Sequence, residues 1–156
     1  MRLLIVAVGR LRAGPEADLI ADYAARTGKT GRGQGLGPLE IREVDDQSGG
    51  GKAAEAALLQ KQIPDGAALV AMDERGKAMA SPDFAAWVAR QRDDGIRDCA
   101  FVIGGADGLA PDMRNRADLT LSFGPMVWPH MLARAMLAEQ LYRAASILAG
   151  TPYHRV

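Results

Sequence analysis

The chain has 156 residues, of which 48% are hydrophobic and 24% are charged, a composition typical of one globular domain with a hydrophobic core. Nineteen Lys and Arg residues balance nineteen Asp and Glu residues, so no bulk positive charge indicates a nucleic-acid-binding protein, and any RNA contact needs a local patch. Cys99 is the single cysteine, which excludes an internal disulfide and a cysteine-rich zinc site and is typical of a reducing cytoplasm.

The first apolar run, Leu3–Val8, is too short to span a membrane and lacks a signal-peptide cleavage pattern, so it predicts a buried strand in a cytoplasmic protein. Further short runs share its character. Most are continuous rather than alternating, which is typical of strands covered on both faces. The predicted strands are Leu3–Val8, Leu39–Val44, Leu69–Met72, Cys99–Ile103 and Leu119–Phe123.

Each predicted strand is followed by a stretch with helical character. The predicted helices are Pro15–Arg26, Lys52–Ile63, Ser81–Arg92, Pro111–Arg116 and Pro129–Leu148. Ser81 precedes Pro82 and is a candidate N-cap. The repeated alternation of strand and helix predicts an α/β fold with a mostly parallel sheet of five or six strands and helices on both faces.

Two Gly-rich segments, Gly28–Pro38 and Asp45–Gly51, predict mobile surface loops. Neither is flanked by enough sequence to separate two domains. We therefore expect one domain over residues 1–156.

The motif FVIGGADGL, Phe101–Leu109, places two adjacent glycines after a predicted strand. Gly104 and Gly105 permit a positive φ or a close approach of the backbone to a ligand. They fall at the carboxyl end of the strand, where open α/β sheets bind ligands. The motif lacks both the dinucleotide fingerprint and the Gly-Lys-Ser/Thr of a phosphate-binding loop. A tight turn and a ligand site are therefore equally open.

Two other segments contain candidate ligand contacts. Asp73 ends a strand in LVAMDERGK, where capping a turn is a more common role than binding a ligand. In SFGPMVWPH, Gly124 and Pro125 force a bend, and residues 126–128 would form an apolar slot suited to reading adenine through the main chain. An ordinary connector with Trp128 in the core is slightly favoured there.

The last predicted helix and the residues after it contain both histidines of the chain. Arg134 lies one turn beyond His130 on an otherwise apolar stripe, so its guanidinium must reach solvent, an anion or a partner chain. An alanine-rich face of the same helix favours close packing by another helix, including one from a second subunit. The C-terminal tail, Pro152–Val156, combines Tyr153, His154 and Arg155, a set suited to an unpaired nucleotide, although termini usually fray.

Together these segments resemble the RlmH family of SPOUT-class ribosomal RNA methyltransferases. The matching stretches are MRLLIVAVGR, MDERGK, FVIGGADGL and WPHMLARAMLAEQLYRAASILAGTPYHRV, and the similarity runs from end to end. The resemblance implies a C-terminal trefoil knot, which is an exception to the rule against threaded chains. It also implies a cytoplasmic homodimer that methylates N3 of a pseudouridine in 23S ribosomal RNA on the assembled ribosome.

The resemblance further implies S-adenosylmethionine as the cofactor and a set of residues that contact it. These cofactor-binding residues are Met72, Asp73, Gly104, Gly105, Gly124, Pro125, Met126, Val127, Trp128 and Pro129. Val127 stands where many relatives have threonine, so a hydroxyl contact is lost there. The Gly28–Pro38 segment fits the family pattern poorly and is either disordered or a variable loop that faces RNA.

The predicted catalytic residues have three chemical roles. His130 and His154 are candidate bases for the N3 proton, and Arg134 and Arg155 are candidate cations that stabilise the resulting anion. Tyr153 would stack on the base. By inference from the family, His154 and Arg155 would serve the cofactor pocket of the partner subunit.

Two rival functions stay open at this stage. One is a nucleotide- or dinucleotide-binding α/β enzyme that uses Gly104 and Gly105, although its fingerprints are missing. The other is a non-catalytic dimer associated with the ribosome. For an RNA methyltransferase, the zero net charge predicts that counterion release contributes little to RNA binding. Recognition of the RNA should then depend on its shape and on the whole ribosome.

Overall fold

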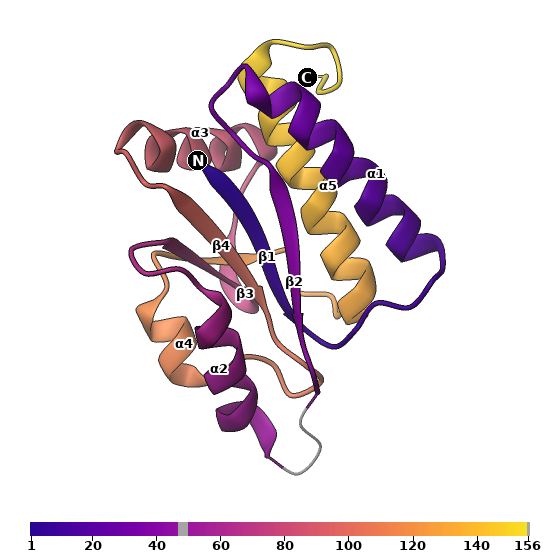
Figure 1. Cartoon of the computed structure of the whole chain (residues 1–156), viewed down its shortest axis with the longest axis vertical. Coiled ribbons are helices and arrows are strands. Elements are labelled where there is room, and N and C mark those ends of the chain that lie inside the picture. The colour runs from indigo at the N-terminus through magenta and orange to yellow at the C-terminus, as the bar shows by residue number, and fades with distance from the viewer. Residues whose placement is uncertain (47–49, 156) are drawn as a thin grey trace.

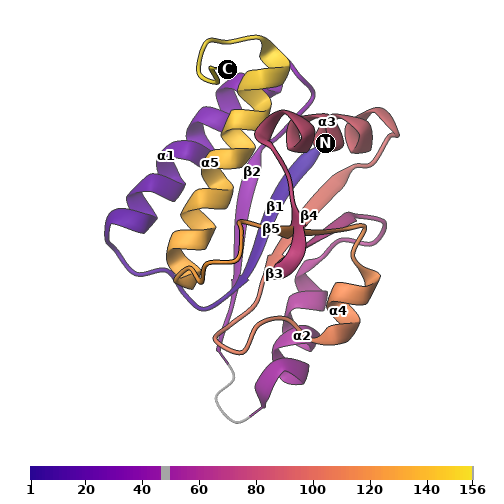
Figure 2. The same ribbon diagram turned by 180° about the vertical axis from the view of Figure 1, so that it is seen from behind.

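The structure is a computed structural model that describes residues 1–46 and 50–155. Strands and helices alternate throughout these residues (Figures 1 and 2). In chain order they are β1 Arg2–Val8, α1 Pro15–Arg32, β2 Leu39–Val44, α2 Gly51–Gln62, β3 Ala68–Ala78, α3 Ser81–Asp93, β4 Asp98–Ile103, α4 Pro111–Arg116, β5 Leu119–Ser122 and α5 His130–Ala149. None of these helices is both long enough and apolar enough to cross a membrane.

The described residues form one five-stranded sheet in the order β2-β1-β4-β3-β5, and every strand pair is parallel. The predicted α/β fold with a parallel sheet is therefore confirmed, with five strands. The trefoil knot and the single domain over residues 1–156 stay predictions.

Helices cover both faces of the sheet, which explains the continuous apolar runs (Figure 1). On β1, the side chains of Leu3, Ile5 and Ala7 belong to the core under α1, α3 and α5. The alternate side chains of Leu4 and Val6 belong to a second core, which is closed by α2 and α4. All five residues are fully buried.

The predicted loop Gly28–Pro38 was wrong in its first half, because residues 28–32 belong to helix α1, whereas residues 33–38 lie outside any helix or strand. Helix α1 continues past the predicted end to Arg32, and Figures 1 and 2 show it lying along α5. Gly31 is buried where the chain turns back, and a Cβ on it would lie 2.6 Å from the carbonyl oxygen of Leu36. Tertiary packing therefore outweighs the helix-weakening effect of glycine here.

Strand β3 continues beyond the predicted end at Met72 to Ala78. Its pairing with β5 shifts register between Met72 and Lys77, so the charged residues between them form an irregular segment within the strand. A Cβ on Gly76 would lie 2.7 Å from the backbone of Thr120, which explains a glycine at this close approach.

Two smaller predictions concern the N-cap of α3 and the connector before α2. Ser81 does not cap α3, because Ala80 is the N-cap and the Ser81 hydroxyl donates to Oε1 of Gln140 at 2.8 Å instead. Part of the predicted connector Asp45–Gly51, residues 47–49, lies outside the described residues.

Candidate active site

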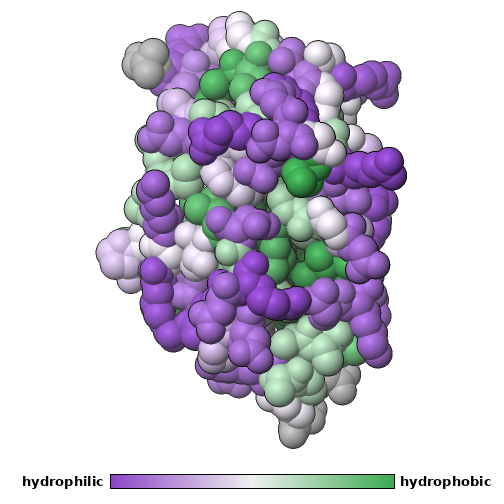
Figure 3. Space-filling model, turned by 90° about the vertical axis from the view of Figure 1, so that its left-hand side faces the viewer, coloured by the Kyte–Doolittle hydropathy of each residue, from purple (hydrophilic) through white to green (hydrophobic). Residues whose placement is uncertain are grey.

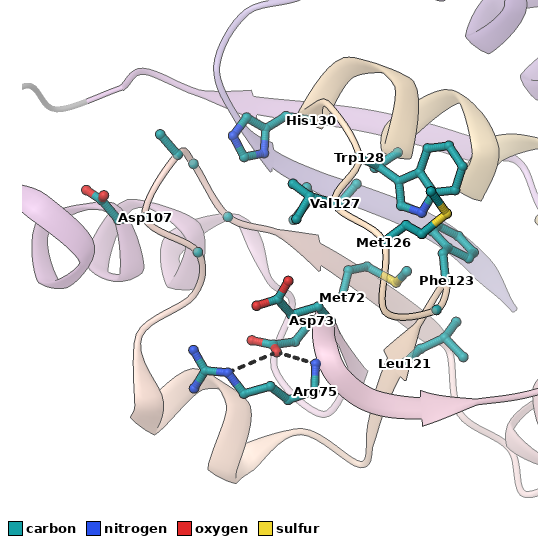
Figure 4. Close-up of a pocket in the computed structure, with 18 residues that line it drawn as sticks. Met72, Asp73, Arg75, Asp107, Leu121, Phe123, Met126, Val127, Trp128 and His130 are labelled. Atoms are coloured by element: carbon teal, nitrogen blue, oxygen red, sulfur yellow. Dashed lines mark hydrogen bonds and ion pairs between the residues drawn. The ribbon is translucent and has the colours of Figure 1, made fainter.

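A cavity of about 280 Å³ opens at the carboxyl edge of the sheet, between the irregular segment of β3, the loop after β4 and the loop after β5 (Figure 4). These are the segments in which the sequence places ligand contacts. The lining consists of residues 72–75, 103–108 and 126–128 together with Leu121, Phe123, Gly124, His130 and Ala133.

The structure brings together most of the predicted cofactor-binding residues. Pro125 and Pro129 are the two that do not line the cavity. His130, at the start of α5, is the one predicted catalytic residue in the lining. In Figure 4 the side chain of Met72 comes from β3, and those of Met126 and Trp128 come from the loop after β5.

The glycine loop, residues 104–108, is both a tight turn and a wall of the cavity. Gly105 and Gly108 form an isolated antiparallel bridge, and the Gly108 amide donates to the Gly105 carbonyl at 3.0 Å. A Cβ on Gly104 would lie 2.6 Å from the carbonyl carbon and oxygen of Gly108. Because backbone atoms cannot move aside cheaply, any side chain at position 104 would open the loop.

Asp73 is held in place by neighbouring groups, as the turn-capping role predicts. One carboxylate oxygen accepts from the Arg75 backbone amide at 2.9 Å, a bond drawn in Figure 4. The other oxygen accepts from Nη1 of Arg114 at 3.3 Å. The side chain is largely buried while still lining the cavity. Asp73 therefore fixes the irregular segment and adds negative charge to the wall.

The apolar loop, residues 123–129, exposes large hydrophobic side chains beside the cavity. Met126 is 70% exposed, Val127 is 85% exposed and Trp128 is 37% exposed. The favoured alternative, a connector with Trp128 in the core, was wrong. Gly124 has a φ of 102°, and its amide donates to the Ser122 hydroxyl at 3.0 Å, which makes the bend that turns the loop outward.

Glu55 is a residue that the sequence interpretation missed. It lies on α2 behind the glycine loop and is 5% exposed, and its Oε2 atom has no hydrogen-bond partner among the described residues. A Cβ on Gly105 would lie 2.8 Å from that oxygen, so the carboxyl group fills the space that a side chain at 105 would need. The sequence signal that could have identified Glu55 is a single acidic residue within a run of alanines and leucines, AAEAALL.

Burial raises the pKa of the Glu55 carboxyl, and the negative charges of Asp46 and Asp107 act in the same direction. The Gly105 backbone and His130 oppose that rise in pKa. The charged form of Glu55 is therefore disfavoured at its position directly behind the loop that lines the cavity.

Arg134 does not lie beside His130 in the cavity. Its side chain is fully buried, and Nη1 donates to Oε2 of Glu43 at 2.7 Å. Its Nη2 atom donates to the carbonyl oxygens of Gly9 at 3.0 Å and Val8 at 3.3 Å. Of the three partners that the sequence left open, an anion is the one observed, and these contacts indicate a structural role.

The described part of the C-terminal tail does not fray. Gly150 ends α5 with a left-handed conformation, and the Tyr153 hydroxyl donates to Oε1 of Glu139 at 2.8 Å. The guanidinium carbon of Arg143 lies 4.7 Å from the centre of the Tyr153 ring, and Nη1 of Arg143 lies 3.1 Å from Nδ1 of His154. Burial and the Glu139 hydrogen bond raise the pKa of Tyr153. Arg155 is exposed.

Figures 1 and 2 show the tail at one end of α5 and the loop after β5, which lines the cavity, at the other end. With 20 residues, the helix is about 30 Å long. His130 starts the helix at the cavity, whereas Tyr153, His154 and Arg155 follow its other end. The structure therefore does not bring the tail to the cavity of its own chain.

The parallel sheet, with a ligand-sized cavity at the carboxyl ends of its strands, defines the class of α/β proteins that bind a small ligand at this edge. Residues 1–154 match the sequence model of the family described as "Predicted SPOUT methyltransferase". The chain belongs to this SPOUT methyltransferase family. The assignment favours a methyltransferase over the rival class of nucleotide-binding enzymes.

Close relatives cover the full chain. It is 65% identical over 156 residues to "Ribosomal RNA large subunit methyltransferase H" of Dinoroseobacter shibae, with 100% of both chains covered. A protein of the same name from Paracoccus denitrificans is 64% identical over 155 residues, with 99% of each chain covered. The resemblance to the RlmH family is therefore confirmed.

A solved structure shares the fold at low sequence identity. It is a probable methylase family protein from Haemophilus influenzae Rd KW20, with a TM-score of 0.50 and 14% identity. The match covers 99% of this chain and 70% of that chain. This likeness supports the α/β fold alone.

Proposed function

We propose that the chain transfers a methyl group from S-adenosylmethionine to N3 of a pseudouridine in 23S ribosomal RNA. The observation that carries this proposal is the cavity, in which a glycine-walled turn, an acidic segment and an apolar loop meet at one sheet edge. The names of the close relatives support ribosomal RNA of the large subunit as the substrate.

The residues around the cavity fit S-adenosylmethionine. Gly104 and Gly105 bring bare backbone to the wall; a Cβ on Gly104 would meet the Gly108 backbone, and a Cβ on Gly105 would meet the Glu55 carboxylate. Met126 and Trp128 provide an apolar surface for the adenine ring, while Asp73 provides negative charge for the ammonium or sulfonium group. The predicted cofactor contacts of Pro125 and Pro129 would be indirect, through the shape of the apolar loop.

The bound cofactor would supply an electrophilic methyl group on its sulfonium, so the chain mainly has to align the acceptor nitrogen and manage its proton. His130 is exposed at the cavity wall and is the candidate that accepts the N3 proton. Arg134 is buried away from the cavity and would support the site through β1 and β2. The exposed loop at 126–128 leaves room above the cavity for a splayed-out base.

A homodimer would complete the site. The tail of one chain lies about 30 Å along α5 from its own cavity, so Tyr153, His154 and Arg155 can act only at the cavity of a second copy. The hydrophobic side chains of Met126 and Val127 would be covered in such a dimer.

The surface supports recognition of an assembled ribosome rather than isolated RNA. The face in Figure 3 mixes hydrophobic and hydrophilic side chains, and the formal net charge is zero. Counterion release alone would therefore bind free RNA weakly, so the shape of the ribosome must contribute. We accordingly propose that the protein acts in the cytoplasm, where ribosomes assemble.

The test is methyl transfer to ribosomes that lack this modification, with mass spectrometry of the digested 23S ribosomal RNA. We expect the purified protein to add one methyl group to a pseudouridine in intact ribosomes and to modify poorly an isolated hairpin of 23S ribosomal RNA that contains this pseudouridine. A ribosome fraction that gains no methyl group would favour the non-catalytic rival and overturn the proposal. Equal activity on isolated hairpin RNA would overturn the ribosome requirement.

A pair of glycine variants tests the cavity itself. Gly104→Ala should weaken S-adenosylmethionine binding at least tenfold in calorimetry, because its Cβ would lie 2.6 Å from the Gly108 backbone. Gly33→Ala is the control, since a Cβ there meets nothing within 4 Å. Binding by Gly104→Ala with the affinity of the unchanged protein would refute the assignment of this cavity.

A further inference from the structure

The end of the chain contains a small hydrogen-bonded network that fixes one histidine. Glu139 accepts from the Tyr153 hydroxyl at 2.8 Å and from Nη2 of Arg143 at 2.5 Å. The same guanidinium reaches Nδ1 of His154 at 3.1 Å through Nη1. The aromatic ring of Tyr153 packs edge-on against Tyr142, with ring centres 4.6 Å apart. The imidazole of His154 is therefore attached to α5.

The identity of the donor decides where the imidazole carries its proton. An arginine guanidinium has only N–H donors and keeps its charge, so Nδ1 of His154 must be the acceptor of this bond. A nitrogen that accepts carries no proton. The neutral ring must then carry its single proton on Nε2, and a ring protonated on both nitrogens would direct an N–H at the guanidinium.

We propose that Arg143 is a positioning residue that holds His154 in the tautomer with its proton on Nε2. On this assignment, which rests on the proposed function, the tail presents a hydrogen-bond donor to the acceptor base and not a proton acceptor. The suited partner is a carbonyl oxygen next to N3 of the pseudouridine, on which negative charge grows as N3 loses its proton. His154 is then excluded as the base, and His130 is left as the histidine able to accept that proton.

The network orients the donor as well as selecting it. Glu139 and Arg143 lie on α5 at positions i and i+4, and both side chains are mostly buried. The ion pair with Glu139 fixes the position of the Arg143 guanidinium. Its central carbon lies 4.7 Å from the centre of the Tyr153 ring, which packs over it. A tail fixed in this way loses little conformational freedom when it meets RNA.

Nitrogen-15 spectra of the histidine rings test the tautomer directly in the full-length protein. The chain has two histidines. The set of ring signals that disappears in His154→Gln therefore belongs to His154, and the set that remains belongs to His130. We expect His154 to show an unprotonated Nδ1 and a protonated Nε2. A ring with its proton on Nδ1, or one that exchanges freely between the two forms, would overturn the proposal.

Two arginine variants test the cause. Arg143→Met should release the ring to a mixture of tautomers and lower kcat on ribosomes about 100-fold, the typical loss for one aimed donor, with S-adenosylmethionine affinity unchanged. Arg26→Met is the matched control, because Arg26 contacts the rings of Tyr23 and Tyr142 nearby but has no bond to His154. An unchanged tautomer in Arg143→Met would refute the positioning role.

The two proposals fail separately. If the unchanged protein methylates ribosomes while the proton of His154 lies on Nδ1, the tautomer assignment is wrong and the function stands. If the tautomer and its dependence on Arg143 are as expected but ribosomes gain no methyl group, the proposed function fails.

Discussion

Replacing Arg134 with methionine removes a buried cation and leaves its partners behind. Glu43 would keep a negative charge that is only 25% exposed, and the carbonyl oxygens of Val8 and Gly9 would lose their donor. Removing one member of a buried ion pair costs about 3–5 kcal/mol. Partial solvation of Glu43 places the expected loss of unfolding free energy near the lower end, about 3 kcal/mol.

A double-mutant cycle separates the charge from the packing. In Glu43→Gln the amide oxygen can still accept from the backbone amide of Leu11, which the carboxylate does at 2.6 Å. We therefore expect Arg134→Met combined with Glu43→Gln to recover about 1–2 kcal/mol relative to the sum of the single variants. Urea unfolding measures the free energy of unfolding of all three variants, provided that its dependence on urea concentration, the m-value, is the same in each.

The matching surface change is Arg155→Met, because Arg155 is exposed in the tail. It should change the unfolding free energy by less than about 0.5 kcal/mol. The reasoning is refuted if Arg134→Met unfolds within about 0.5 kcal/mol of the unchanged protein and yet loses methyl transfer. That result would return Arg134 to the catalytic role expected from the sequence.

Three other changes test the packing, the buried acid and the cavity. Gly31→Ala should lower the unfolding free energy by about 1–3 kcal/mol, because its Cβ meets the Leu36 carbonyl at 2.6 Å, whereas Gly28→Ala in the same helix meets nothing within 4 Å and should raise it by about 0.5–1 kcal/mol. Equal effects of the two in thermal or urea unfolding would contradict this packing. Because burial raises the pKa of Glu55, the folded state binds that proton more tightly than the unfolded state, and stability falls as pH rises through the folded pKa. Glu55→Gln should therefore unfold at higher urea than the unchanged protein at pH 8 and at the same urea near pH 4; a difference that grows toward acid pH would show that the sign is wrong. S-adenosylmethionine should change the fluorescence of Trp128, which is 37% exposed at the cavity, while the other tryptophan is buried. A Trp128→Phe protein that keeps the full fluorescence change would disprove this location.

Much of the fold follows from local patterns. The run Leu3–Val8 predicts a strand buried on both faces, and each of its side chains enters one of two cores. Pro111–Arg116 is predicted and observed with the same bounds. Such strands and helices can be predicted from the sequence because their signals, a continuous apolar run or a proline in the first helical turn, span only a few residues.

The boundaries that failed depend on distant contacts. Gly28 and Gly31 suggest a loop by composition, but α1 packs along α5 and the chain returns at Leu36, so the helix continues. Trp128 suggests a core residue by its size, but the bend at Gly124 turns it outward. For α1 the deciding neighbour, α5, lies about a hundred residues away in the sequence, whereas for Trp128 the bend at Gly124 is local but its direction is set by the fold.

The sequence alone determined the α/β pattern and, through its resemblance to a family, the three segments that meet at the cavity. Only the tertiary structure showed that Arg134 is paired with Glu43, that Glu55 lies behind the glycine loop, and that the tail is distant from its own cavity. The physical reason is that strand and helix preferences are local, whereas charge pairing, close backbone approach and the separation of the two ends of α5 are set by how the elements pack.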